Sequence, residues 1–273
     1  MVWNLRLDRY LPWAMITLVV GVLLGMSFRS DHVKPVMTAQ VPEHKFVICV
    51  DPGHPTYYSS GRKVQHGTTE LNVNWQVASD LVDTLSENPD LQVIKTREVR
   101  DALMTNPERA TIANDVHADL LLRLHCDAGP SSGFTVYFPN KQGTDLGKTG
   151  PAMSVISSSR HAAFMVHLGM LDVLRGSLRD RGVRGESKTK VGRKQGVLTG
   201  SIFCEVPVVT VEMVFLSNRH DADFIKSREG RKKMVQALAQ GVEDYVKYLQ
   251  RTDKSNQATS AVKLVRPGEI GGS

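Results

Sequence analysis

The chain has 273 residues, of which 41% are hydrophobic, 23% are charged and 6% are aromatic. These values are ordinary for a globular protein, and they exclude the collagen-like, disordered and disulfide-scaffold classes for most of the chain. The formal net charge is +6, from 34 Lys and Arg against 28 Asp and Glu. Three cysteines (Cys49, Cys126, Cys204) lie in or beside apolar runs, so we expect buried free thiols rather than a disulfide framework.

The first 45 residues differ from the rest of the chain. The segment from Leu11 to Phe28 carries no formal charge, and as a helix it would extend about 27 Å, close to the ~30 Å hydrocarbon core of a bilayer. We expect a transmembrane signal anchor over 11–28, a short segment at 1–10 before it and a linker at 29–45 after it. A cleaved signal peptide is the alternative, because Gly25 and Ser27 offer small residues where a signal peptidase reads.

Residues 46–250 are predicted to form one α/β domain, followed by a flexible tail at 251–273. Continuous apolar runs of β-forming residues predict strands that are covered on both faces. Helical patterns separate them, and one helix is expected to begin at Asn106 as N-cap with Pro107 in its first turn. The predicted strands are 46–50, 120–124 and 208–211, and the predicted helices are 71–85, 106–116, 151–175 and 229–249. This alternation favours a three-layer α/β sandwich with a largely parallel sheet.

Residues with metal-binding or acid–base chemistry stand where these strands end. The first strand runs into His54, the second ends at His125 and the last ends at Glu212. Ligands of open α/β sheets bind outside the carboxyl ends of the strands, so these three tips are expected to converge on one site. Glu70, at the start of the first helix, is a fourth candidate. Two imidazoles and one carboxylate are a common set for catalytic Zn²⁺, which leaves one carboxylate to move protons; His66 is the best substitute ligand.

The chain resembles the zinc-dependent N-acetylmuramoyl-L-alanine amidases of bacterial cell-wall turnover. The resemblance covers about residues 46–249, and its blocks appear in the family's order. These blocks are VDPGHP, GTTELNVN, TREVRDALMTNPERATIANDVHADLLLRLHCDAG, SSGFTVYF and VPVVTVEMVFLSNRHDADFI.

The resemblance implies a twisted sheet flanked by helices and one Zn²⁺ held by His54, Glu70 and His125. It also implies Glu212 as the catalytic carboxylate. The expected reaction is hydrolysis of the amide between N-acetylmuramic acid and L-alanine in peptidoglycan, with Glu212 as general base and acid. Asp51 is expected to support the site by accepting a hydrogen bond that orients a ligand.

Three residues depart from the family's pattern. Pro55 follows the first ligand where Gly is usual, Cys126 follows His125 where Ala is usual, and Val214 stands where Gly commonly follows the catalytic Glu by two. A β-branched residue resists positive φ. A membrane-tethered, catalytically impaired peptidoglycan-binding or scaffold protein is therefore one alternative function. A thiol hydrolase that uses Cys126 as nucleophile is a second.

The positive charge is local. Residues 175–194 contain eight Lys or Arg and two acidic residues, with several glycines, and we interpret them as a mobile loop that is either a solvated surface or an electrostatic guide to anionic wall polymer. Nucleic acid is not an expected partner, because aromatic residues are not interleaved with the basic ones. The expected partners are peptidoglycan and the cytoplasmic membrane. The expected location is that membrane, with the catalytic domain on the periplasmic or cell-wall side.

Overall fold

The computed structural model describes residues 45–264. The segment predicted to span a membrane, 11–28, lies outside these residues, as do the predicted cytoplasmic segment at 1–10 and the linker as far as residue 44. None of the helices in the described part of the chain is both long and apolar enough to cross a membrane. The three cysteines are buried free thiols, as the sequence predicts.

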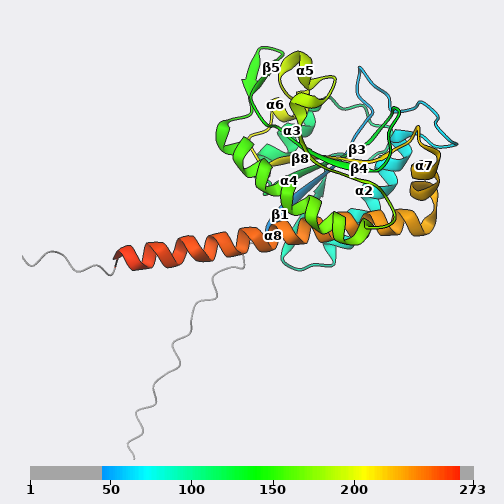
Figure 1. The fold of residues 1–273 in the computed structure, drawn as a ribbon. Helices are drawn as coiled ribbons and strands as arrows, with labels where there is room; N and C mark the ends of the chain where they lie inside the picture. The colour runs from blue at the N-terminus through cyan, green and yellow to red at the C-terminus, as the bar shows by residue number, and fades with distance from the viewer. Residues whose placement is uncertain (1–44, 265–273) are drawn as a thin grey trace, which may run out of the picture. The chain divides into compact units, whose positions relative to one another are not determined.

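A six-stranded mixed sheet forms the middle layer (Figure 1). Every pairing within it is parallel except that between β4 and β8, which is antiparallel. In spatial order the strands are β2 (Leu91–Lys95), β1 (Phe46–Pro52), β3 (Leu120–Asp127), β8 (Val208–Phe215), β4 (Phe134–Phe138) and β7 (Asp180–Gly185). A separate hairpin joins β5 (Gly143–Asp145) and β6 (Lys148–Gly150). The strands predicted from apolar runs are therefore present as β1, β3 and β8, in parallel and side by side.

Helices cover both faces of this sheet, so the predicted α/β sandwich is confirmed for the described residues. One face is covered by α2 (Glu70–Ser86), α4 (Met153–Leu174) and α8 (Arg228–Leu264). The other carries α3 (Asn106–Asp115), with α5 (Gly192–Gln195) and α6 (Thr199–Ile202) near it. The short helix α7 (Arg219–Lys226) follows β8 and packs on α8.

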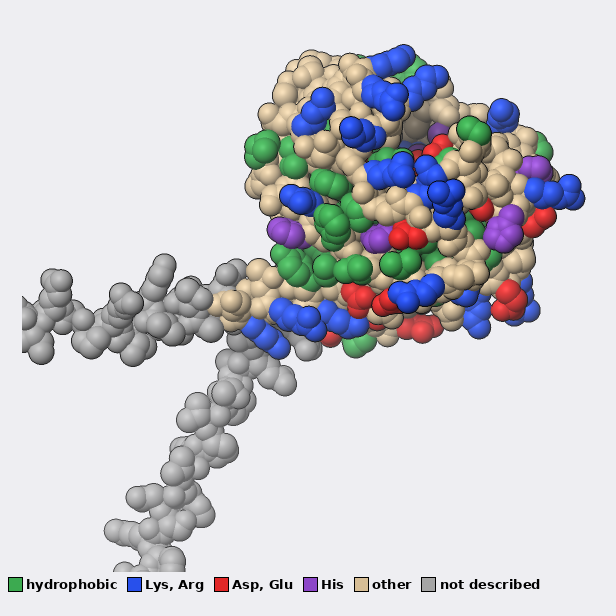
Figure 2. Space-filling view, viewed as in Figure 1, with side chains coloured by type: hydrophobic (Ala, Val, Ile, Leu, Met, Phe, Trp, Pro, Cys, Tyr) green, Lys and Arg blue, Asp and Glu red, His purple; other side chains and the backbone are tan. Residues whose placement is uncertain are grey.

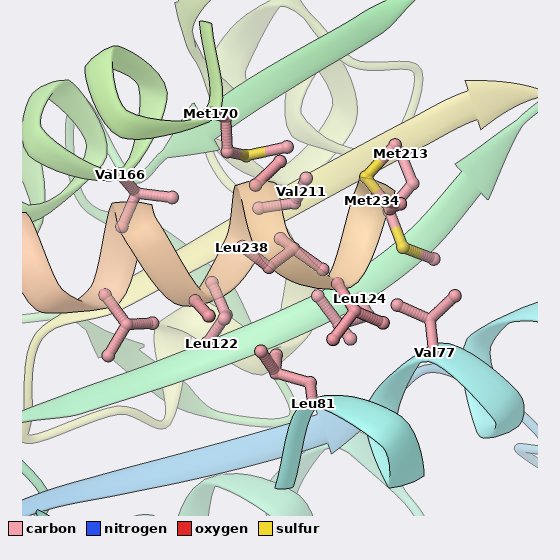
Figure 3. Close-up of a cluster of buried hydrophobic side chains, with 14 of the residues drawn as sticks. Val77, Leu81, Leu122, Leu124, Val166, Met170, Val211, Met213, Met234 and Leu238 are labelled. Atoms are coloured by element: carbon pink, nitrogen blue, oxygen red, sulfur yellow. The ribbon is translucent and has the colours of Figure 1, made fainter. Parts of the chain in front are cut away.

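The larger core lies between the sheet and the first of these helix layers (Figure 3). Leu122 and Leu124 of β3 face Val77 and Leu81 of α2, with Leu238 of α8 beside them. Because side chains alternate along a strand, the residues between these leucines must point to the opposite face. Burying a leucine-sized side chain stabilises a fold by roughly 1.5–3 kcal/mol. A shift of register by one residue would expose these leucines, so the core fixes the register and keeps the polar residues that alternate with them on the opposite face of the sheet.

The opposite face is apolar at one end and polar at the other. A small cluster that includes Cys49, Leu121 and Val208 packs against α3 near the beginning of the strands. Farther along the same strands, the residues of matching parity are polar: Asp51, Arg123, His125, Thr210 and Glu212. The hydrophobic half secures the strands, and the polar half forms one wall of the site described below.

Several local predictions need correction. The N-cap of α3 is Thr105 rather than Asn106, because the Thr105 side chain accepts a hydrogen bond from Glu108 N–H while the Glu108 carboxylate accepts one from Thr105 N–H. Strands β3 and β8 continue past His125 and Glu212, which therefore lie within their strands instead of ending them.

Two segments expected to be irregular carry regular structure. Residues 175–194 are not a mobile loop throughout, because Asp180–Gly185 pairs with β4 as strand β7. Helix α8 continues to Leu264, well into the segment expected to be a tail from 251 onward. Figure 1 shows its last turns beyond the helix and sheet layers. The earlier part of α8 packs on α4 and α2, which stabilises its first turns. Because nucleation is the costly step of helix formation, later residues can then add to this helix one at a time.

Candidate active site

His54 lies in the loop directly after β1. Its Nδ1 lies 3.1 Å from the backbone oxygen of Ser59, which fixes the imidazole from one side. Gly61 packs against the His54 side chain as well, since a Cβ at position 61 would lie 2.7 Å from Cβ of His54. His54 itself has φ near +60°, a left-handed conformation that few non-glycine residues adopt. Strained backbone of this kind persists where surrounding contacts enforce it, and it clusters at functional sites.

Glu70 is the first residue of α2. The Thr69 side chain caps this helix by accepting a hydrogen bond from Asn72 N–H, as the sequence predicts for the Thr68–Thr69 pair. A carboxylate in the first turn is stabilised by the positive end of the helix dipole. Glu70 Oε1 also accepts a hydrogen bond from the backbone N–H of Cys126, so α2 and β3 together hold the carboxylate in place.

His125 reaches the same point from β3, and Gly53 makes the approach possible. A Cβ at position 53 would lie 2.3 Å from Cε1 of the His125 ring. No side chain tolerates such a contact. The glycine of the Asp-Pro-Gly-His block is therefore required because the second imidazole packs directly on its α-carbon.

The three side chains converge on Glu70 Oε1. His54 Nε2 lies 3.1 Å and His125 Nδ1 lies 3.0 Å from this oxygen. One ligand atom from each of the three residues falls within 4.8 Å of the others. The imidazole rings stand edge to face, 5.2 Å apart and 80° between planes. Two imidazole nitrogens and a carboxylate oxygen at this spacing suit a zinc ion, with room for a further ligand.

The ionisation of Glu70 and of His125 also suits a metal. Burial raises the pKa of Glu70, but hydrogen bonds from His125 and His54 outweigh that effect and keep its pKa below the usual range. Burial is the largest cause in His125 and keeps its pKa low, so this imidazole stays neutral at pH 7. In His54 the carboxylate of Glu70 outweighs burial and raises the pKa. A carboxylate and a neutral imidazole are the forms that bind metal.

Glu212 stands beside this cluster on the neighbouring strand β8. It is paired in register with His125 on the adjacent strand. Its Oε2 is buried and unpartnered among the described residues. Burial, with the nearby charges of Glu70 and Asp127, raises the pKa of Glu212 well above its usual value. A buried unpaired carboxyl is costly for a fold, and its persistence beside a candidate metal site marks it as functional.

A cavity of about 470 Å³ opens onto these side chains. His54, His125 and Glu212 contribute to its wall, as do residues from the start of α3 and from the segment around α6. A second cavity of about 680 Å³ adjoins it and shares Thr56, Tyr58, Asn106 and Thr199. Of the polar residues of this wall, the sequence predicted a functional role only for His54, His125 and Glu212. Arg123 could have been found, since it interrupts a run of leucines.

Asp51 supports the site, as predicted, but it accepts no hydrogen bond from His54 or His125 and so orients neither directly. Its carboxylate accepts hydrogen bonds from Arg109, Arg123 and Thr96. Burial raises its pKa, but the two guanidinium charges outweigh that effect and keep the group ionised. Arg109 in turn donates to the backbone oxygens of Pro52 and Pro55, which flank His54. Asp51 therefore supports the His54 loop through Arg109.

Other residues considered from the sequence lie apart from the cluster. His66 does not join it, and its Nε2 lies 3.2 Å from the backbone oxygen of Ser217. Cys126 points into the large core, where burial raises the pKa of its thiol and its Sγ lies 3.6 Å from Asn74 Oδ1. Neither the substitute ligand nor the thiol nucleophile is supported. Val214 lies in extended strand β8, buried and without positive φ, so no glycine turn is needed there.

Residues 48–244 match the model of a protein family described as N-acetylmuramoyl-L-alanine amidase. The chain belongs to this amidase family. The match spans both predicted histidine ligands, Glu70 and Glu212. Zinc dependence is typical of the family, and the His54, Glu70 and His125 cluster is compatible with it.

Relatives of this chain agree with the family assignment. The chain is 26% identical to N-acetylmuramoyl-L-alanine amidase Rv3717 of Mycobacterium tuberculosis, over 84% of this chain and 97% of that protein. It is also 26% identical to the uncharacterized protein YqiI of Bacillus subtilis, over 77% of this chain and 90% of that one. Among solved structures, the catalytic domain of the amidase CwlV from Bacillus (Paenibacillus) polymyxa matches with a TM-score of 0.60. At 21% identity, over 74% of this chain and 98% of that one, this likeness shows the shared fold.

Proposed function

We propose that the protein is a zinc-dependent hydrolase of peptidoglycan, cutting the amide between N-acetylmuramic acid and the L-alanine of the stem peptide. One observation carries the proposal: the His54, Glu70 and His125 cluster stands beside the buried, unpartnered carboxyl of Glu212 in a member of this amidase family. Neither a metal cluster alone nor a buried Glu alone indicates hydrolysis. Their adjacency in one cavity supplies both parts that hydrolysis of a stable amide needs.

The residues of the chain would divide the work. His54, Glu70 and His125 would hold the metal, since their ligand atoms converge and their orientations are fixed by Ser59, Cys126 and Gly53. Zinc, when bound, would polarise the scissile carbonyl and make a water molecule more acidic. Glu212 would accept the proton of that water at its unpartnered oxygen and return it to the departing amine.

The raised pKa of Glu212 fits this role. A general base works best when its pKa lies near the working pH, because it must both accept and release a proton. Burial and two nearby carboxylates raise it here, whereas Arg123 lowers it. A bound divalent cation would lower the pKa of Glu212 further and favour the ionised form, which accepts the proton.

The deciding experiment combines metal content with turnover. The full chain should bind one zinc per molecule and release stem peptides from purified peptidoglycan, and a chelator should abolish the release. Release that survives complete removal of metal would exclude the zinc mechanism. Zinc binding without any release would favour the alternative of a peptidoglycan-binding scaffold, although the extended backbone at Val214 offers no support for it.

Attachment to the cytoplasmic membrane is a separate proposal. The apolar segment 11–28, which lies outside the described residues, would act as the anchor and would leave residues 1–10 in the cytoplasm. The substrate lies outside the cytoplasm, so the catalytic domain should face the cell wall. Protease added to intact spheroplasts should then remove the domain, and complete protection would contradict this topology.

A further inference from the structure

A buried arginine lies in the same cavity as the proposed catalytic residues. Arg123 precedes His125 by two positions on β3, so the two side chains leave the sheet on the same face. Its side chain is only 4% exposed, and it contributes to the cavity wall together with His125 and Glu212. A buried guanidinium is expensive unless its charge and its donors are satisfied.

The contacts of Arg123 leave part of the guanidinium free. Nε donates to Asp51 Oδ2 at 3.1 Å, and Nη2 donates to Asn106 Oδ1 at 2.7 Å. Nη1 has no hydrogen bond to any residue that the structure describes. Gly200 makes space for this end, because a Cβ there would lie 2.2 Å from Nη1. The side chain is thus held rigidly by two partners while one edge keeps unused donors.

The charges around Arg123 do not cancel. Asp51 is a single carboxylate that both Arg109 and Arg123 contact, so this buried group of three carries one excess positive charge. Glu186 offers only partial compensation: burial raises its pKa to about 7, and its oxygens already accept from Ser201 and Leu198. Positive charge is therefore in excess within the group of Asp51, Arg109, Arg123 and Glu186. Glu212, the other carboxyl of the wall, is the proposed catalytic base and belongs to the metal cluster.

Unpartnered hydroxyl groups lie next to this charge. Thr210 is paired in register with Arg123, and Thr135 is paired in register with Glu212. The Oγ1 atoms of both threonines are buried and have no partner among the described residues. Thr210 contributes to the cavity wall. Buried polar atoms are nearly always satisfied in folded proteins, so a row of unsatisfied ones beside a free guanidinium edge indicates a ligand with acceptor atoms.

We propose that Arg123 determines substrate specificity by binding a carboxylate of the stem peptide, with Thr210 as a second donor. This inference rests on the proposed amidase function. The sugar next to the scissile bond is uncharged once its lactyl group is in the amide, so the nearest anion belongs to the peptide, on the residue after L-alanine. Guanidinium groups recognise carboxylates through paired, charge-assisted hydrogen bonds. Arg123 is too deeply buried for an extended anionic polymer to contact it.

Two matched substrates test the inference. Both compounds have the γ-carboxyl capped as a methylamide, as it is blocked by the next peptide bond in the stem peptide. In the first, N-acetylmuramoyl-L-alanyl-D-glutamic acid γ-methylamide, the α-carboxylate is free, and in the second, the D-isoglutamine γ-methylamide, an α-amide takes its place. The full chain should have at least a tenfold higher kcat/KM for the free acid, which corresponds to about 1.4 kcal/mol. Arg123→Gln should remove this preference, mainly through KM, while zinc content stays at the parent level. Arg251→Gln, which removes an exposed charge of α8, should keep the preference.

The outcomes separate this inference from the proposed function. Equal kcat/KM for the two compounds in the parent protein would overturn the role of Arg123, even if Arg123→Gln fails to fold. Cleavage of neither compound would count against the amidase function. In that case binding of the two uncut compounds to the zinc-loaded full chain, measured by calorimetry, decides: tighter binding of the free acid supports the role, and equal affinity overturns it. Arg123→Lys should retain part of the preference.

Discussion

His125 on β3 and Glu212 on β8 are paired in register on adjacent parallel strands. Both strands are held by apolar side chains on the opposite face, so the distance between these two residues is set by the sheet and not by a loop. Sites built on strands keep their geometry better than sites built on loops. The loop after β1 and the first turn of α2 place His54 and Glu70 beside this rigid pair of His125 and Glu212.

Removing a proposed metal ligand should remove zinc and activity together. His54→Ala or His125→Ala leaves two protein ligands, so we expect zinc occupancy to fall and turnover of peptidoglycan to fall with it. Metal analysis of the purified variants, alongside stem-peptide release, checks this. His66→Ala is the matched control and should keep both, because His66 lies outside the cluster. Full zinc occupancy in His125→Ala would show that the ligand set is wrong.

Glu212→Gln should separate catalysis from metal binding. Gln keeps the size of Glu but cannot accept a proton at neutral pH. Zinc content should therefore stay close to that of the parent, while turnover falls by about 10² or more, the scale of a lost general base. Zinc loss in this variant would instead make Glu212 a ligand, and Glu70 would become the candidate base.

Gly53→Ala should impair the site through sterics alone. The new Cβ would overlap the His125 ring at 2.3 Å, and the imidazole would have to move away from Glu70. We expect zinc affinity to fall by about 10- to 100-fold, as for other losses of ligand orientation. Titration with zinc against a competing chelator measures this, and circular dichroism should show an unchanged fold. Parent-like affinity would mean that His125 is not positioned by Gly53.

The sequence predicted those parts of the fold that carry strong local signals. Continuous apolar runs identified β1, β3 and β8, whose carboxyl ends bring the site together. Strand β7 was missed because Asp180–Gly185 is charged and rich in glycine, and it becomes a strand only by pairing with β4. The partners of Asp51 were also missed, because Arg109 and Arg123 are distant from it in sequence and only the fold brings them together.

Glu186 should make the fold less stable as the pH rises. It is fully buried in the 3₁₀ turn Glu186–Lys188, and burial raises its pKa to about 7 from a usual value of 4.5. Between these values the folded protein binds more protons at this site than the unfolded chain, so stability falls as the pH rises through that window. Below about pH 4.5 the effect vanishes because the group is protonated in both states.

Glu186→Gln should remove this dependence. The amide stays neutral, it can accept the hydrogen bond from Leu198 N–H, and the Ser201 hydroxyl can rotate to accept from its NH₂ group. At about 1.4 kcal/mol per pKa unit, the variant should exceed the parent in unfolding free energy by up to about 3 kcal/mol at pH 8.5. The difference should shrink toward pH 4.5. Urea unfolding of both proteins across this range measures it. The two proteins share all other titrating groups, so the difference between their curves isolates Glu186. Parallel curves would mean that its carboxyl has the same pKa in the folded protein as in the unfolded chain.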